Sequence, residues 1–504
     1  MKTTATLALA FTSLAAQAGE EQMVGLNGYA TEAIFTIGET LNGYTPPGIP
    51  DGMFALARGD HVHLLVNHEL VASAGYPYDL GSGAVLTGAR VSTFKISKDD
   101  RTVVDAGLSY DTIYNRAGEV VDDPSDLEFG GLNRLCSAFG VDAGECGFVD
   151  AIFFTGEETG GGTEWALDIE NGELWAAPAL GRGAWESVTP LGIPSINKTH
   201  VALLLGDDRG GAPLYLYVGE KDPSAGAGFL VRNGLAEGSL YMWKADDGST
   251  VPGELTGTGS FKLGHFVEVE NYNPAKAGMP GFDALGYADQ DTLDDQQIAL
   301  GAFQFSRPED LHTNPYNGHQ AVFASTGRSS LFPEDSWGTT YLIDVKISKG
   351  ALKKNDLGAN IRVIFDGDDA AGNGLTDPDF GIRSPDNLCW ATDHFAYIQE
   401  DRSVSGFGAV SGEEASIWKL QAHSGAILRV AQINRDAELP FGQTDGDPFD
   451  LGDWESSGII DVSTLFDEKK GSLFLFNVQA HSVRDGNVAT EGLVQGGQIL
   501  FLSK

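Results

Sequence analysis

Stretches of alternating apolar and polar residues recur along the chain, each followed by a short polar turn and a second alternating stretch. In residues 91–104, for example, Phe94 and Ile96 alternate with polar neighbours before an Asp-rich turn. This two-residue period with a polar turn is typical of a half-buried β-hairpin. Six such hairpins are centred on Lys95, Asp168, Lys244, Asp344, Lys419 and Leu500.

The hairpin centres lie about 73 to 100 residues apart. A two-strand unit repeated at a nearly constant spacing is typical of a β-propeller, in which four-stranded antiparallel units repeat around an axis. The repeat is longer than common blades of about 40–50 residues, so each blade needs long loops. The sequence therefore predicts an all-β fold, a six-bladed β-propeller with long loops and short loop helices, as one domain over residues 19–504. A pair of β-sandwiches is the alternative.

The first residues have the pattern of a secretory signal. Lys2 precedes an apolar run at residues 7–11, and the small residues Ala16 and Ala18 precede a polar segment. The run is too short to span a bilayer, and the small residues fit a signal peptidase site, so we expect cleavage after Ala18. No later run approaches the length of a membrane span, so we expect a protein secreted to the periplasm or the medium.

The charge of the chain is strongly negative. Its 504 residues carry 71 Asp and Glu against 32 Lys and Arg, a formal net charge of −39. Such a charge repels nucleic acid and anionic membrane surfaces and favours cations. Acidic loops at residues 289–295, 366–379 and 445–455 offer the oxygen ligands that Ca²⁺ prefers, so calcium is an expected cofactor. A solvated acidic surface is the alternative for each loop.

Several glutamates follow apolar segments at the predicted ends of strands. In a propeller such positions meet near one face of the central channel, where converging carboxylates must share protons or bind metal. These candidates are Glu69, Glu157, Glu158, Glu220, Glu309 and Glu455.

Short motifs along the chain carry a resemblance to a known family. The most specific are WESSGIIDVS at 454–463 and SLFLFNVQAHS at 472–482. The others are VNHE at 66–69, LNRLCSA at 132–138, FTGEE at 154–158, FSRPED at 305–310 and SPDNLCW at 384–390. On these motifs the sequence resembles the PhoX-type alkaline phosphatases, which are exported six-bladed propellers that use iron and calcium.

The resemblance implies a metal centre and a phosphate-binding group. Carried over by motif, Cys136 would be a thiolate ligand to iron, because a soft thiolate suits iron better than calcium. Arg307 would hold the phosphate, since its planar fork matches two phosphate oxygens, and Lys198 is assigned with it as a catalytic residue. The implied metal carboxylates are Glu69, Glu158, Glu220, Glu309, Asp386 and Glu455.

Two alternatives to these assignments stay open at this stage. Cys136 and Cys146 are close enough in sequence to form a disulfide, which would remove the iron ligand and leave Cys389 unpaired. Arg307 could pair with Glu309 inside a blade and have only a structural role.

Three functions are compatible with the sequence. The first is an exported metal-dependent phosphomonoesterase that acts on a small phosphoester as a monomer. The second is a non-catalytic, calcium-stabilised propeller that binds a partner or a surface polymer. The third is a calcium-dependent lactonase or other esterase, because propellers host all of these activities.

Overall fold

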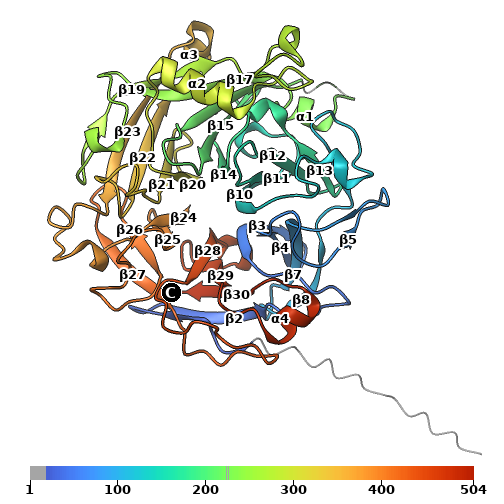
Figure 1. Cartoon of the computed structure of the whole chain (residues 1–504), viewed down its shortest axis with the longest axis vertical. Coiled ribbons are helices and arrows are strands. Elements are labelled where there is room, and N and C mark those ends of the chain that lie inside the picture. Colours follow the sequence, from blue (N-terminus) through green and yellow to red (C-terminus); the bar gives the residue numbers. More distant parts are fainter. Residues whose placement is uncertain (1–18, 223, 225) are drawn as a thin grey trace, which may run out of the picture.

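The computed structural model describes residues 19–222, 224 and 226–504, and its strands form mainly antiparallel sheets arranged around a central axis (Figure 1). The predicted signal peptide, residues 1–18, lies outside the described residues. Within the described residues, no helix is long and apolar enough to cross a membrane.

Six units of four strands follow one another around the axis. The first contains β3 (Pro50–Arg58), β4 (His61–His68), β7 (Arg90–Ser97) and β8 (Val103–Leu108), with a small hairpin of β5 (Tyr78–Asp79) and β6 (Val85–Leu86). The second contains β10 (Leu135–Val141), β11 (Ile152–Glu157), β12 (Glu164–Asp168) and β13 (Glu173–Ala176), and β9 (Thr112–Tyr114) pairs in parallel with β13. The third contains β14 (Trp185–Pro190), β15 (His200–Asp207), β16 (Tyr215–Glu220) and β17 (Gly238–Ala245).

The fourth unit contains β20 (Pro308–Thr313), β21 (Gln320–Ser325), β22 (Thr339–Lys346) and β23 (Leu357–Asp366). Strand β18 (Phe261–Lys262) pairs with its outer strand β23, and β19 (Gly264–Val269) pairs with both β23 and β17, which joins the fourth unit to the third. The fifth contains β24 (Pro385–Trp390), β25 (Ala396–Glu400), β26 (Ser416–Leu420) and β27 (Ile427–Ile433), with β1 (Met23–Gly25) at its edge. The sixth contains β28 (Trp454–Asp461), β29 (Leu473–Ala480), β30 (Gly496–Ser503) and β2 (Ala30–Thr36).

The first strand of each unit faces the axis, and these six inner strands form a closed ring. Strand β3 contacts β10, and the contacts continue through β14, β20, β24 and β28 back to β3. Figure 1 shows these six strands around the centre of the molecule. Every residue of β14 and β24 is buried, because these inner strands are covered on both sides.

The two ends of the chain close the ring. Strand β2, near the N-terminus, pairs with β30 at the C-terminus, where Ala30 lies opposite Ser503. Phe35 of β2 packs against Phe94 of β7 in the next unit, with ring centroids 5.0 Å apart. This pairing joins the two ends of the described chain in the sixth unit, so the ring closes between the sixth and the first unit.

The all-β prediction is confirmed, and the closed ring excludes a pair of sandwiches. Hydrogen bonding through β19 and β23 joins the third and fourth units into one sheet, so the count of six blades stays our interpretation of the inner ring. Five of the six predicted hairpin centres lie in the third strand of a unit, whereas Lys244 lies in the fourth strand, β17.

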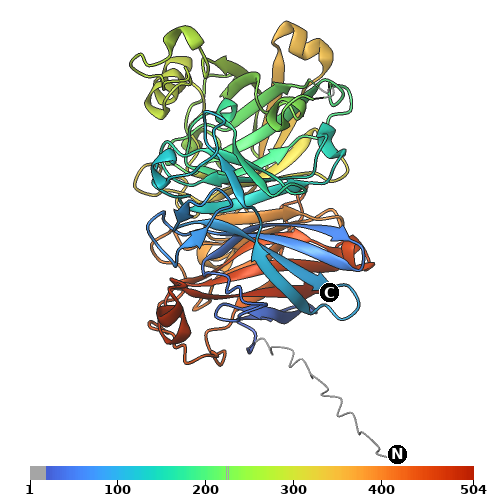
Figure 2. The same cartoon turned by 90° about the vertical axis from the view of Figure 1, so that its right-hand side faces the viewer.

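The described helices are short and lie in loops, as expected. They are α1 (Phe229–Arg232), α2 (Gln290–Leu300), α3 (Lys349–Lys354) and α4 (Gly486–Glu491). Helices α2 and α3 lie at one edge of the ring and α4 lies at the opposite edge (Figures 1 and 2).

The acids of the three loops serve mainly local structure. Asp289 caps α2 through the Thr292 N–H, Asp366 accepts from the Gly257 N–H, and Asp445 pairs with Arg435. These three acids therefore lie outside the clusters described next, whereas Glu455, the last residue of the third loop, belongs to one of them.

Candidate metal centre

The same position in each inner strand carries a candidate metal ligand. The candidate ligand is the second residue of each of the six inner strands. In five of these strands the register with the neighbouring strand shifts directly around this residue, which is typical of a β-bulge. Bulges turn a side chain out of the regular alternation, here toward the axis. The six residues are Asp51, Cys136, Glu186, Glu309, Asp386 and Glu455.

A second set of polar residues comes from the neighbouring strand of each unit. The second strand runs antiparallel to the first, so its end lies beside the start of the inner strand. The residue directly after it is ionisable in five units out of six. These residues are Glu69, Glu158, Asp208, Thr326, Asp401 and His481.

All of these residues except Thr326 line one cavity of about 410 Å³. Within it, four groups have ligand atoms that lie within 4.8 Å of one another. They are Asp51, Glu69 and Cys136; Cys136, Glu158 and Glu186; Glu186, Glu309 and Asp386; and Asp386, Asp401 and Glu455. Because neighbouring groups share members, they form one continuous path of possible ligands around the axis.

The cavity concentrates negative charge that the protein alone does not neutralise. Burial raises the pKa of Glu186, and the nearby Glu309 and Asp386 raise it further. Burial and neighbouring acids likewise raise the pKa values of Asp51 and Asp386. Among the described residues, Asp51 Oδ1 has no hydrogen-bond partner although Asp51 is buried. Buried carboxylates in this state either take up protons or bind cations, so the donor set fits metal ions.

Cys136 lies between carboxylates. Its Sγ is 3.2 Å from Asp51 Oδ2 and 3.2 Å from Glu186 Oε1, and burial followed by these two acids raises the pKa of the thiol. Cys136, Cys146 and Cys389 are all free. Cys146 lies beyond the far end of β10, beside Gly192, so the alternative of a Cys136–Cys146 disulfide is not present.

Two arginines supply positive charge in the cavity. Arg307 Nε is 2.7 Å from Asp208 Oδ1, and its Nη2 is 2.8 Å from Asp208 Oδ2 and 3.0 Å from Glu309 Oε1. Burial alone would raise the pKa of Asp208, yet Arg307 lowers it to about 2. Within the described residues, Nη1 of Arg307 makes no hydrogen bond, so one edge of the guanidinium stays available. Arg134 pairs with Glu69 at 2.7 Å and with Glu158.

The backbone is strained at the edge of the cavity. Arg134 and Arg307, each directly before an inner strand, have φ values of 49° and 81°. Left-handed backbone in a non-glycine residue costs energy and often marks a functional site.

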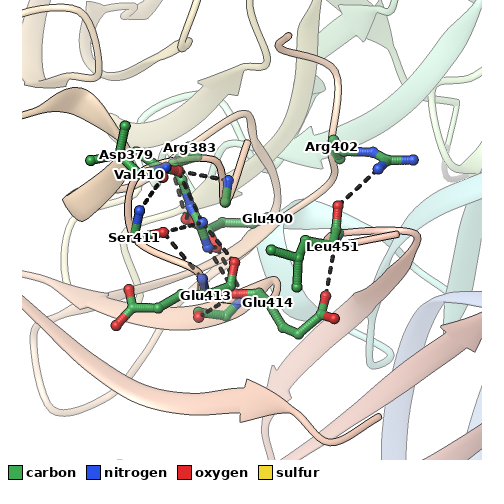
Figure 3. A network of polar contacts seen from close by, with 12 residues as sticks. Asp379, Arg383, Glu400, Arg402, Val410, Ser411, Glu413, Glu414 and Leu451 are labelled. Atoms are coloured by element: carbon green, nitrogen blue, oxygen red, sulfur yellow. Dashed lines mark hydrogen bonds and ion pairs between the residues drawn. The ribbon is translucent and has the colours of Figure 1, made fainter. Parts of the chain in front are cut away.

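A buried ion-pair network holds the loop after Asp401 (Figure 3). The fully buried Arg383 donates to Glu400 at 2.8 Å and to Asp379 at 3.3 Å, and it also donates to the Glu413 and Glu414 carbonyls. Asp379 in turn accepts from the Ser411 N–H at 2.7 Å. Glu400 directly precedes Asp401 and Arg383 lies three residues before Asp386, so this network lies next to two residues of the cavity along the chain.

Most of the residues predicted from sequence meet in this cavity. They are Glu69, Cys136, Glu158, Arg307, Glu309, Asp386 and Glu455. Glu157 is buried next to them, but it accepts from the Asn133 and Thr163 N–H groups outside the cavity, and burial raises its pKa to about 8.

Two predicted residues lie elsewhere. Glu220 is exposed at the end of β16, opposite His200 at the start of β15, and Lys198 is exposed in the turn between β14 and β15. That end of the unit is opposite to the end where Glu186 and Asp208 lie. Glu220 lies away from the cavity because a third strand ends at the opposite face of the unit from a second strand.

Six ionisable residues of the cavity were not predicted from the sequence. A repeated signal was present, because a proline precedes Asp51, Glu309 and Asp386, and the triplet Trp-Glu-Ser occurs at Glu186 and at Glu455. Proline is tolerated as the first residue of a strand, so proline followed by an acid marks the start of an inner strand. The missed residues are Asp51, Arg134, Glu186, Asp208, Asp401 and His481.

Comparison with solved structures supports the fold. The chain is similar to PhoX of Pseudomonas fluorescens in complex with vanadate, a transition state analogue. The identity is 15%, 97% of each chain is covered, and the TM-score is 0.62. The α-L-arabinofuranosidase PaAbf62A of Podospora anserina is 9% identical over 97% of each chain, with a TM-score of only 0.28. No curated protein sequence matches the chain.

A family model described as alkaline phosphatase PhoX matches residues 173–446. The match covers more than half of the 504 residues and contains the ligand candidates of the third, fourth and fifth units. The chain therefore belongs to the PhoX alkaline phosphatase family.

Proposed function

We propose that the protein is an exported, metal-dependent phosphomonoesterase that releases phosphate from small organic phosphoesters. Its family makes it a phosphoesterase of the alkaline phosphatase type. The observation that supports a metal-dependent phosphomonoesterase is the composition of the cavity, which nine carboxylates, one thiol and two arginines line. A phosphate dianion would be repelled from this cavity unless bound cations neutralised the acids.

The proposed ligands differ in chemistry across the cavity. Cys136 with Glu158 and Glu186 combines a soft thiolate with carboxylates and suits iron. Asp386, Asp401 and Glu455 offer only oxygen and suit calcium. Metal ions bound there would supply Lewis-acid charge neutralisation and a water nucleophile at moderate pH.

The residues of the chain would bind and orient the ester. Arg307 is fixed by Asp208 and Glu309, so its guanidinium would meet the phosphoryl group already oriented, which lowers the cost of binding. Arg134, held by Glu69 and Glu158, would contribute a second positive charge to the phosphoryl oxygens. This pair of arginines favours an anionic substrate over the neutral lactone of the esterase alternative.

Turnover and metal content together test the proposal. Protein purified with its metals should release phosphate from p-nitrophenyl phosphate, contain iron and calcium by elemental analysis, and lose activity with a chelator. Metal-loaded protein that releases no phosphate from any monoester would contradict the proposal and favour the non-catalytic binding propeller.

The proposal includes export and a monomeric state. The pattern of residues 1–18 supports a cleaved signal peptide, and residues 19–504 would then fold as one domain. Sequencing the N-terminus of the mature protein should place Gly19 first. Light scattering of that protein should give the mass of one chain.

A further inference from the structure

Four apolar residues line the cavity together with its charged and polar groups. They are Ile49, Val71, Ala74 and Val494. We call these four residues the apolar wall. Ile49 directly precedes β3, Val71 and Ala74 lie in the loop after β4, and Val494 lies in the loop between α4 and β30. The wall therefore belongs to the first and sixth units, whereas the arginines precede β10 and β20.

The apolar wall is joined by its backbone to the proposed metal ligands. The Glu69 N–H donates to the Ile49 carbonyl at 2.9 Å, and the Gly48 N–H donates to the Leu493 carbonyl at 2.8 Å. Gln495, next to Val494, lies with its Oε1 2.7 Å from Nδ1 of His481. A phosphoryl group bound at the proposed metal ligands would therefore lie next to the apolar wall.

Two residues of the wall have left-handed backbone. Ile49 has a φ of 50° and Val494 a φ of 78°, and both are β-branched residues for which left-handed backbone is unusual. Glycine adopts such backbone without this cost but would remove the apolar surface. Strain of this kind persists where a function needs the residue.

Exposure shows that the wall is accessible. Val71 is 49% exposed, whereas Ile49 is 9% exposed. Apolar surface next to a charged cavity gains most from contact with an apolar group of the ligand.

From the position, strain and exposure of the wall, we infer that it holds the alcohol part of the substrate, so that the enzyme prefers phosphomonoesters of apolar alcohols. This inference rests on the proposed function. The phosphoryl group would lie at the arginines and the ligand path, and the alkyl or aryl group would lie against Val71 and Val494.

The test compares two esters with similar leaving groups. Butyl phosphate and glycerol 1-phosphate are both esters of primary alcohols, so their chemistry is alike while the polarity of the alcohol differs. We expect the wild-type protein to prefer butyl phosphate in kcat/KM by about tenfold, since burying a few methylenes has an effect of this size.

Variants of the wall should remove this preference. Val71→Ser with Val494→Gly should bring the ratio of the two kcat/KM values to about one, mainly by lowering the value for butyl phosphate. Val494→Gly relieves backbone strain, so its melting temperature should not fall, which separates substrate contact from a structural role. Val85→Ser is the matched control, because Val85 is 50% exposed and lies outside the cavity.

Binding provides a readout that does not depend on turnover. The affinities of butylphosphonate and 2,3-dihydroxypropylphosphonate, measured by calorimetry, should show the same preference and the same loss in the double variant. If no ester is hydrolysed, the proposed function fails and the binding ratio alone decides the inference. A wild-type ratio near one, or a ratio unchanged in the double variant, would overturn the inference.

Discussion

Arg307 combines two roles that the sequence left as alternatives. It pairs with Asp208 and Glu309, as a structural residue would, and it also lines the cavity. We expect Arg307→Lys to keep the charge but lose the two-pronged geometry, and so to lower kcat by about 10²–10³-fold. Phosphate release at saturating substrate would measure this effect.

The melting temperature of the same variant separates the two roles. Lysine and arginine tolerate the left-handed backbone at this position equally, so the φ of 81° adds no difference between them. If the melting temperature falls while activity per molecule is unchanged, Arg307 is only a scaffold for Asp208 and Glu309.

Cys136 contributes a ligand type that no other residue of the cavity offers. We expect Cys136→Ser to abolish iron binding and activity while calcium remains bound, because a neutral hydroxyl does not replace a thiolate. Elemental analysis of the purified variant measures both metals. Cys146→Ser is the control, since Cys146 lies at the far end of β10, and it should keep iron. Equal iron content in the Cys136 variant and the wild type would refute the assignment.

At the scale of strands, the repeat was predictable from sequence but the direction of each strand was not. Alternation placed Lys95 and Lys419 in hairpins, and both lie in third strands. The positions of the acids at strand ends were harder to predict, because a glutamate after an apolar run gives no indication of which strand of the unit it follows. Glu69 and Glu158 end second strands and reach the axis, whereas Glu220 ends a third strand and points away from that face.

Residues whose contacts are with partners distant in sequence could not be predicted from the sequence either. Arg134 pairs with Glu69 of the first unit, and Asp208 of the third unit pairs with Arg307 at the start of the fourth, so these contacts form only where neighbouring units meet at the axis. Their neighbours along the chain carry no periodic signal that would indicate this. Closure of the ring, which pairs Ala30 with Ser503, is likewise a property of the complete chain.

The network around Arg383 stabilises the loops of the fifth unit. Arg383→Met would leave Asp379 and Glu400 buried without their cation, which should lower the free energy of unfolding by about 3–5 kcal/mol. The ion pair of Arg402 with Asp450 is the control, because its side chains are 31% and 41% exposed. Arg402→Met should cost about 0–1 kcal/mol. Urea denaturation of both variants measures the difference, and equal costs would contradict it.

At the scale of the whole molecule, all six units contribute to one charged centre. All six inner strands place an ionisable group at the axis, so the repulsion among these groups acts on every unit at once. Bound calcium should relieve this repulsion and stabilise the fold by about 2.7 kcal/mol at a hundredfold excess over its Kd.

The pH dependence of stability follows from the same carboxylates. Burial, together with neighbouring acids, raises the pKa values of Asp51, Glu186 and Glu455 in the folded state well above their ordinary values of 3.8 and 4.5. At any pH between the ordinary and the raised pKa values, the folded, metal-free protein therefore holds more protons than the unfolded chain. Stability must fall with rising pH wherever the folded state binds more protons.

We therefore expect the melting temperature of chelator-treated protein to be highest near pH 4 to 5, the ordinary pKa range of these acids, and to fall steadily as the pH rises to 9. Metal-loaded protein should not show this fall, because the cations replace the protons that the carboxylates lose. The difference in melting temperature between the metal-loaded and the chelator-treated protein should increase with pH. Calorimetry of both forms across this range measures it, and parallel curves would show that the central acids hold neither protons nor metal in the folded state.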